Sequence, residues 1–278
     1  MSRGTVCLTF DFDAISLWIA RDQTTPGPVS RGEFGAYAIG RILTLLRRHG
    51  VSSTFFVPGH TLETYPAQCE AIAAAGHEIA LHGYAHEPVS TLDRDAELAV
   101  NRRSAELIEK LTGRPPSGHR TPSWDFTENT IAILTELGVE YDSSLMGTDF
   151  EPYLARSGDR CDPDGPYAFG AASSVVELPV SWTLDDYPHL EFLRTARYVM
   201  PGLQDAGEMF ARFRRDVEYM AGTVDDGVVT VTLHPQVVGR GARMVALEEF
   251  ITGCLDLGVV FARCADVARR VRPALLGA

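Results

Sequence analysis

Residues 5–14 read TVCLTFDFDA, an apolar, β-prone run that closes on two acids. An unpaired carboxylate is costly to bury, so a strand with both faces covered has no ordinary place for Asp11 and Asp13. Side chains alternate along an extended segment, which puts both acids on one face and turns Phe12 to the other. Either the strand has ended and the acids are solvated, or it delivers two carboxylates to a site where a cation or a shared proton holds them together.

Short β-rich runs alternate with helical periodicity along the rest of the chain. Strands that alternate with helices of this length predict βαβ units and a parallel sheet. Seven or eight such units favour a (β/α) barrel. An open doubly wound sheet is the alternative, but no G-x-G-x-x-G sequence or phosphate loop follows the first strand. The expected strands are 5–10, 53–57, 77–81, 118–120, 139–142, 174–178, 228–233 and 259–261. The expected helices are 33–49, 61–75, 91–112, 127–137, 207–221 and 242–257.

Composition and charge narrow the classes of function. The 278 residues are 45% hydrophobic and carry a net charge of −12, which argues against binding to nucleic acid or to an anionic membrane surface. No apolar run is long enough to span a bilayer. Met1 leads straight into the first predicted strand without a signal peptide, and the five cysteines form no C-x-x-C pair, so we expect a cytoplasmic protein with reduced thiols.

Domain organisation follows from the absence of a linker or an internal repeat. A single domain is expected over residues 1–278. The stretch 146–172 is rich in Gly, Asp and Pro and predicts a long loop, which would serve as a lid or as an interface element.

Polar side chains gather where the predicted strands end, which is where (β/α) barrels place their catalytic groups. These residues are Asp11, Asp13, His60, His82, Arg120, Asp142, Glu177 and His234.

The sequence His82-Gly83-Tyr84-Ala85-His86 is the strongest local signal for a metal site. If a helical turn follows the strand, His82 and His86 stand at i and i+4 on one face, a spacing at which two imidazoles can bind one ion. Two histidines with a carboxylate from Asp11 or Asp13 suit zinc, cobalt or non-haem iron. The alternative is a pair of unrelated surface histidines. The apparent zincin match at His77-Glu78 fails, because position 81 is Leu.

Two further strand ends carry groups that suit hydrolytic chemistry. Arg120 can hold a carboxylate through two hydrogen bonds, and Trp124 offers a flat apolar wall. His234 ends the most apolar strand. A single histidine there is commonly a core residue with satisfied hydrogen bonds, but the other polar residues at the strand ends favour a functional role.

Taken together, TFDFDA, HGYAHE, RTPSW and LHP resemble the polysaccharide deacetylase family (NodB-homology domain), in order from about residue 5 to 265. Members are metal-dependent amide hydrolases on a distorted (β/α) barrel. The resemblance implies one divalent ion, Zn²⁺ in the first place with Co²⁺ or Ni²⁺ as alternatives, and a homo-oligomer. It implies that the metal ligands are Asp13, His82 and His86, that the general base is Asp11, that Arg120 positions this base, and that the general acid is His234.

One departure bears on the substrate. The family usually has two adjacent acids where this chain has Asp11-Phe12-Asp13; this spacing, with Trp18 and SWTLDDY at 181–187, is similar to a branch of peptidoglycan-deacetylase-like proteins, cyclic imidases and allantoinase-like enzymes. We therefore expect a hydrolase of non-peptide carbon–nitrogen bonds that acts on a small amide or cyclic imide. The alternatives are a true N-acetyl-sugar or peptidoglycan deacetylase with a role in carbohydrate metabolism, a non-catalytic sugar-binding barrel, and a non-haem iron oxygenase. The expected substrate-binding residues are Trp124, Trp182, Asp185, Asp186 and Tyr187.

Overall fold

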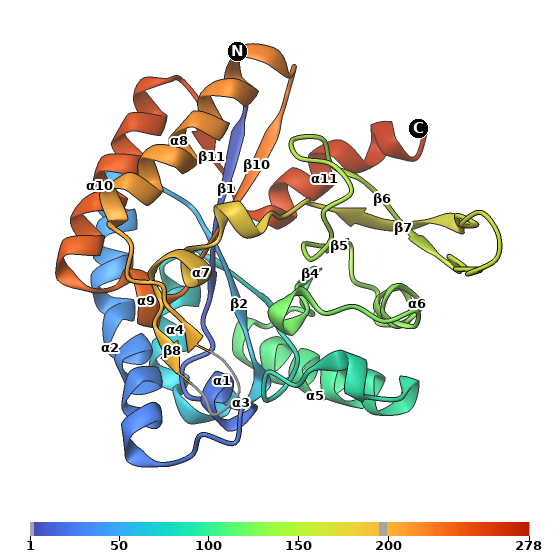
Figure 1. Cartoon of the computed structure of the whole chain (residues 1–278), viewed down its shortest axis with the longest axis horizontal. Coiled ribbons are helices and arrows are strands. Elements are labelled where there is room, and N and C mark those ends of the chain that lie inside the picture. The colour runs from blue at the N-terminus through green and yellow to red at the C-terminus, as the bar shows by residue number, and fades with distance from the viewer. Residues whose placement is uncertain (1–2, 195–198, 278) are drawn as a thin grey trace.

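Figure 1 shows the computed structural model, which describes residues 3–194 and 199–277. Its strands are β1 (Thr5–Asp11), β2 (Thr54–Val57), β3 (Glu78–Leu81), β4 (Gly118–His119), β5 (Tyr141–Asp142), β6 (Tyr153–Ser157), β7 (Ala171–Glu177), β8 (Leu193–Arg194), β9 (Val199–Met200), β10 (Val228–Leu233) and β11 (Val260–Phe261). Its α-helices are α1 (Ser16–Ile19), α2 (Pro26–His49), α3 (Gly59–Thr64), α4 (Pro66–Ala74), α5 (Arg94–Thr112), α6 (Thr130–Glu136), α7 (Asp186–Leu190), α8 (Ala206–Thr223), α9 (Pro235–Val238), α10 (Gly241–Asp256) and α11 (Cys264–Leu275). Short 3₁₀ turns cover Val89–Thr91, Pro122–Trp124 and Trp182–Leu184.

Nine of these strands form a strongly curled sheet in the order β10-β1-β2-β3-β4-β5-β7-β6, with β11 paired to the start of β1, and β8 pairs with β9 in a separate ribbon. Neighbours are parallel from β10 to β7, whereas β6 runs antiparallel to β7. Long helices cover the outer face, with α2, α8 and α10 on the side of β1 and β10 (Figure 1). The predicted distorted (β/α) barrel is confirmed in its half-barrel form; within the described residues β10 and β6 are the two ends of the hydrogen-bonded path.

Strand β1 lies in the middle of the molecule and is buried along its whole length. Its even-numbered side chains, such as Leu8 and Phe10, pack in the large core beneath the outer helices. Cys7 faces the other way, into a smaller core inside the curl that α11 helps to close. Because side chains alternate, Asp11 is directed to the inner face of the curl, at the end where the parallel strands finish.

All the predicted strands are present, with ends that shift by up to three residues. The prediction of one long loop over 146–172 is wrong in part, because Tyr153–Ser157 forms β6 and pairs with β7. The glycines, acids and prolines of that stretch cluster in the connection between the two strands. The edge strand β6 was missed because it is short and has only one fully buried residue, Ala155. The expected helix 61–75 divides into α3 and α4, since Pro66 begins the second helix and has no N–H to continue the first.

Helix α11 was not predicted, and neither were the short helices α1, α7 and α9 or the small β8–β9 ribbon. Within the described residues, no helix combines the length and apolar character that crossing a membrane requires.

A packing test of the inner core uses Gly118 of β4. A Cβ at this position would overlap the ring of Tyr141, which is fully buried and donates a hydrogen bond from its hydroxyl to Glu78. Overpacking of this kind costs about 1–3 kcal/mol, so we expect Gly118→Ala to lower the free energy of unfolding in urea by about that amount. Gly40 in α2 has open space around it, and Gly40→Ala should raise stability by up to about 1 kcal/mol. A Gly118→Ala protein as stable as the parent would contradict the packing described.

Candidate active site and metal centre

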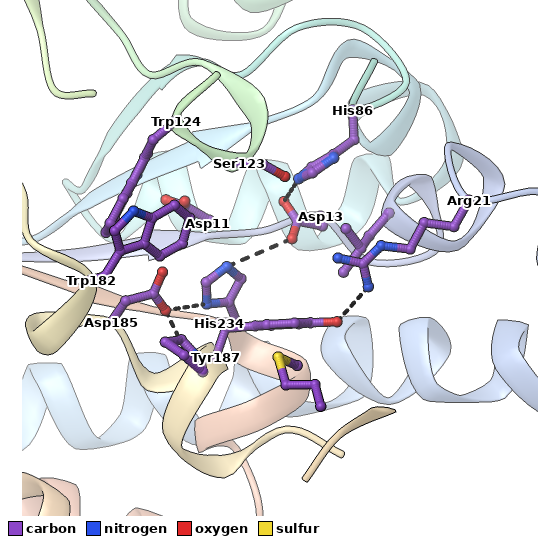
Figure 2. A pocket seen from close by; sticks show the side chains of 13 residues that line it. Asp11, Asp13, Arg21, His86, Ser123, Trp124, Trp182, Asp185, Tyr187 and His234 are labelled. Carbon is purple, nitrogen blue, oxygen red and sulfur yellow. Dashed lines mark hydrogen bonds and ion pairs between the residues drawn. The ribbon is translucent and has the colours of Figure 1, made fainter. Parts of the chain in front are cut away.

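A pocket with a volume of about 190 Å³ opens at the carboxyl ends of the sheet strands. Figure 2 shows how side chains from distant parts of the sequence converge there. Among the residues expected from the sequence, it is lined by Asp11, Asp13, His86, Trp124, Trp182, Asp185, Tyr187 and His234. Its wall also includes Arg21 and Met200, which the sequence did not single out.

Asp13, His82 and His86 form a buried group of three potential ligands, with one donor atom of each within 4.8 Å of the others. Asp13 Oδ1 lies 3.4 Å from His82 Nε2 and 3.9 Å from His86 Nε2. It is buried without a hydrogen-bond partner, a costly state for a carboxylate oxygen unless a cation binds it. Two imidazoles and a carboxylate are a donor set that suits zinc and similar divalent ions. The residues therefore fit a divalent metal.

The tautomer of His82 also suits metal binding. His82 Nδ1 lies 2.8 Å from the backbone oxygen of Arg120, to which it can only donate. In the neutral imidazole this bond leaves the lone pair on Nε2, the nitrogen that faces Asp13. The strand end at β4 thus orients a ligand that comes from β3.

The route by which His86 reaches the site differs from the prediction. Residues 82–86 form no helix, because Gly83 at φ 63° and His86 at φ 61° are both in the left-handed region. The carboxylate of Glu87 accepts hydrogen bonds from the backbone N–H groups of Tyr84 (3.0 Å) and Ala85 (2.8 Å) and holds the turn. A tight loop, instead of i,i+4 spacing, brings the two imidazole centroids to 5.2 Å.

Burial and charge set the protonation of this group. Burial would raise the pKa of Asp13, but His86 and His82 outweigh it and hold the pKa well below its usual range. Burial lowers the pKa of His86 to about 4. Burial would also lower the pKa of His82, yet the charges of Asp11 and Asp13 raise it. At neutral pH Asp13 and His86 therefore already have the forms that bind metal, and the raised pKa of His82 makes metal binding there compete with a proton.

Asp11 is held by Arg120, which is fully buried at the end of β4. Arg120 Nη1 donates to Asp11 Oδ1 (2.7 Å) and to Thr9 Oγ1 (2.9 Å), while Nε and Nη2 donate to the backbone oxygen (2.8 Å) and the hydroxyl (2.9 Å) of Ser143. The guanidinium lies 4.1 Å above the ring of Phe56. The contact with Asp11 uses one carboxylate oxygen instead of the two-bond clamp that we considered, so Asp11 Oδ2 is left facing His82 Nε2 at 3.8 Å.

His234 follows β10 and is fixed by Asp186. Its Nδ1 lies 2.8 Å from Asp186 Oδ1, and its backbone N–H donates to both oxygens of the same carboxylate. This leaves Nε2 directed toward Asp13 Oδ2, 3.9 Å away. Burial would lower the pKa of His234, but the charges of Asp185 and Asp186 outweigh it and raise the pKa to about 10. His234 thus holds a proton on the nitrogen that faces the pocket.

Asp186 was expected to bind substrate, but the structure places it behind His234, where it does not line the pocket. Sequence reasoning missed this contact because Asp186 and His234 are 48 positions apart and no local spacing joins them. The side chain of Asp185 does line the pocket, and burial raises its pKa to about 7.

Aromatic side chains form one end of the pocket. The rings of Trp124 and Trp182 lie 4.3 Å apart at an angle of 46°, and Trp182 is 48% exposed. Trp124 and the preceding Ser123 both have positive φ, of 53° and 55°, a costly backbone state that turns the indole toward the pocket. Tyr187 packs against the ring of His234 at 5.1 Å.

Other polar strand ends lie outside the pocket. His119, Asp142 and Glu177 are neighbours in register across β4, β5 and β7, with His119 Nδ1 2.6 Å from Asp142 Oδ1. Glu177 Oε1 accepts from the backbone N–H groups of Ser144 and Leu145, both at 2.9 Å, which steadies the turn that contacts Arg120. Burial and the charge of Asp142 raise the pKa of Glu177 well above its usual value. The expected strand-end residue His60 bonds instead to Ser16.

Comparison with known proteins places this site in a family. The polysaccharide deacetylase family pattern matches residues 1–141. A peptidoglycan deacetylase of Helicobacter pylori is 34% identical over 258 residues, which cover 87% of this chain and 86% of that protein. A solved structure from Mycobacterium smegmatis, assigned as a polysaccharide deacetylase, is 34% identical with a TM-score of 0.86 over 98% of this chain and 91% of the other. The solved PuuE allantoinase, at 20% identity, shares the fold with a TM-score of 0.77 over 97% of this chain and 90% of the other.

The chain therefore belongs to the polysaccharide deacetylase family. It is a deacetylase-like hydrolase that acts on carbon–nitrogen bonds other than peptide bonds, and its buried Asp-His-His group is suited to a divalent metal.

Substitutions of Asp11 and of Asp13 should have different effects on metal affinity. Asp13→Ala removes a carboxylate from the ligand group, so the zinc affinity measured by competition with a chelating dye should fall by more than about 100-fold, the upper range for losing a residue that only supports a ligand. Asp11→Asn keeps the shape of the side chain and should bind zinc nearly as well as the parent. The opposite pattern, with Asp11→Asn losing the ion and Asp13→Ala keeping it, would exchange their roles.

The charge of Asp186 should be visible in the pH dependence of the rate. Asp186→Asn removes one of the charges that raise the pKa of His234, so the alkaline limb of the kcat profile should move to lower pH than in the parent. Asp186→Glu, which keeps the charge, is the control and should retain most of the parent profile. An unchanged alkaline limb in Asp186→Asn at equal zinc loading would show that His234 does not set it.

Proposed function

We propose that this protein removes the acetyl group from the nitrogen of an N-acetylated sugar of the kind found in peptidoglycan, with zinc as the bound ion. The observation that carries the proposal is the convergence in one pocket of Asp13 and His86 of the ligand group, Asp11 on Arg120, and the protonated His234. The 34% identity to a peptidoglycan deacetylase over 87% of the chain supports this substrate class above the small amide favoured by the sequence.

The groups of the chain are placed for an acid–base hydrolysis. A divalent ion supplies polarisation of the amide carbonyl and lowers the pKa of water toward about 7. Asp11 keeps one oxygen on Arg120, and its other oxygen is available to accept a proton from the attacking water. His234 holds a proton on Nε2 and gives it to the departing nitrogen, while Asp186 fixes the ring through Nδ1. The carbon–nitrogen bond breaks, the water oxygen joins the acyl carbon, and the products are acetate and a free amine.

A small ring amide is the second candidate, and the size of the pocket is compatible with it. A volume of about 190 Å³ is below the roughly 300–1,000 Å³ of typical ligand pockets. Such a space suits one sugar ring or one small imide ring better than several linked sugars. In a cyclic imide the same acid–base steps would open the ring without releasing a second product.

A hydrolysis screen distinguishes the two candidates. The protein is tested both loaded with zinc and stripped of metal by a chelator. The substrates are N-acetylglucosamine oligomers, purified peptidoglycan, succinimide, hydantoin and allantoin. We expect acetate and free amine from a sugar substrate, and only with metal. Hydrolysis of the ring amides alone would support the second candidate and contradict the first. If the zinc-loaded chain hydrolyses none of these substrates, the proposed function is wrong.

The base can be tested on whichever substrate reacts. Asp11→Asn cannot accept the proton from water, so kcat should fall by at least about 100-fold, the lower end for general acid–base catalysis, while bound zinc stays stoichiometric. Excess zinc should not restore the rate. If the zinc-bound Asp11→Asn protein keeps the parental kcat, Asp11 is not the general base.

A further inference from the structure

Arg21 is a cation in the pocket wall for which the reaction chemistry has no use. It follows α1, eight residues after Asp13, and its side chain is half-buried. Its Nη1 donates to the hydroxyl of Tyr187 at 2.6 Å, and the guanidinium packs over the rings of Trp18 (5.8 Å) and Tyr187 (5.4 Å). Among residues 3–194 and 199–277, no carboxylate lies within 4.0 Å of it, and its other N–H groups have no hydrogen-bond partner. The residues between these ranges, 195–198, contain no acid.

The acids of the pocket are already engaged with other cations. Asp11 is bonded to Arg120, Asp13 lies against the imidazoles of its ligand group, and Asp185 Oδ1 is 3.5 Å from His234 Nδ1. Arg21 is therefore the pocket cation that has no counter-charge within the described part of the chain. An arginine presents five N–H donors in a fixed planar array that matches a carboxylate.

The position of Arg21 divides the pocket into two ends. In Figure 2, Arg21 and the hydroxyl of Tyr187 lie on one side of Asp13 and His234, and the indoles of Trp124 and Trp182 lie on the other. The reacting groups thus stand between an aromatic end and a cationic end. A substrate whose amide lies over Asp13 and His234 would direct one substituent toward Arg21.

A second arginine, Arg31, lies near that end of the pocket. Arg31 also packs over the ring of Trp18, at 4.5 Å, and is paired with Glu191. Burial, together with the nearby charges of Arg21 and Arg240, lowers the pKa of Arg31. Glu191 pairs with Arg31, so Arg21 is the unpaired cation at this end of the pocket among the described residues. An unpaired cation favours an anionic substituent over a neutral one.

We propose that Arg21, oriented by Tyr187, binds a carboxylate of the substrate, so that the preferred substrate is an acetamido sugar or related amide that carries an anionic group beside the scissile bond. The chemistry at that bond rests on the proposed function, but the preference for a negative charge rests on Arg21 alone. A guanidinium held by an aromatic hydroxyl and by two rings loses little freedom on binding, which favours a two-bond contact with a carboxylate.

The competing explanation is that Arg21 only supports Tyr187 and the short helix α1. In that case its removal would weaken the binding of neutral and anionic ligands alike. Two acetamido sugars, of which one carries an additional lactyl ether with a carboxylate, separate the two explanations.

The test measures binding of N-acetylmuramic acid and N-acetylglucosamine to the zinc-loaded chain by titration calorimetry; the first sugar differs from the second by a lactyl carboxylate. We expect the parent to bind N-acetylmuramic acid about tenfold more tightly, as one charge-assisted contact predicts. Arg21→Gln should remove this preference by weakening the acidic sugar alone, and Arg21→Lys should keep part of it. Arg47→Gln, which removes an exposed charge on α2, is the control for net charge and should change nothing.

Several results would overturn the inference. These are equal affinity of the parent for both sugars, no measurable binding of N-acetylmuramic acid, and an equal loss for both sugars in Arg21→Gln. A preference that survives in Arg21→Gln would assign the carboxylate to the metal instead. Acetate release from the same samples keeps the two proposals apart. Charge preference without acetate release contradicts only the proposed function, and deacetylation of both sugars with equal affinity contradicts only the role of Arg21.

Discussion

Two carboxylates buried at the end of β1 need positive partners, and the candidate active site is arranged around that requirement. Asp11, the last residue of β1, and Asp13, two residues later, are at most 3% exposed, and both carboxylates face His82. Arg120, fully buried, neutralises one of them, and two imidazoles surround the other. The curled parallel sheet supplies these partners because the carboxyl ends of its strands meet at one edge. The cost of burying the acids without partners is what makes the site specific for cations.

Each partner is in turn held by a neighbouring strand end. The backbone oxygen of Arg120 fixes the tautomer of His82, and Ser143 at the end of β5 holds the guanidinium. The outer row of His119, Asp142 and Glu177 holds the turn that contains Ser143. The position of each charged group in this pocket depends on these outer contacts, and charges this close together affect one another's protonation.

Much of this arrangement could be predicted from the sequence. Alternation along residues 5–14 placed Asp11 and Asp13 on one face, and strand patterns placed His82, Arg120 and His234 at the carboxyl ends of strands. The structure brings all of them together. The path of His86 could not be predicted, because it depends on left-handed backbone at two positions and on a cap from Glu87. The contacts of Asp186 and Arg21 join segments far apart in the sequence, and β6 was hidden beside a turn-forming stretch.

The central claim is that Asp13, His82 and His86 hold one divalent ion. It is tested most directly by crystals of the zinc-loaded protein, with anomalous diffraction recorded on both sides of the zinc absorption edge. The account predicts one strong peak bounded by Asp13 Oδ1 and the Nε2 atoms of His82 and His86. A peak between Asp185, Asp186 and His234 instead, which is the other group of potential ligands in the described chain, would contradict the account, as would the absence of any peak in this pocket.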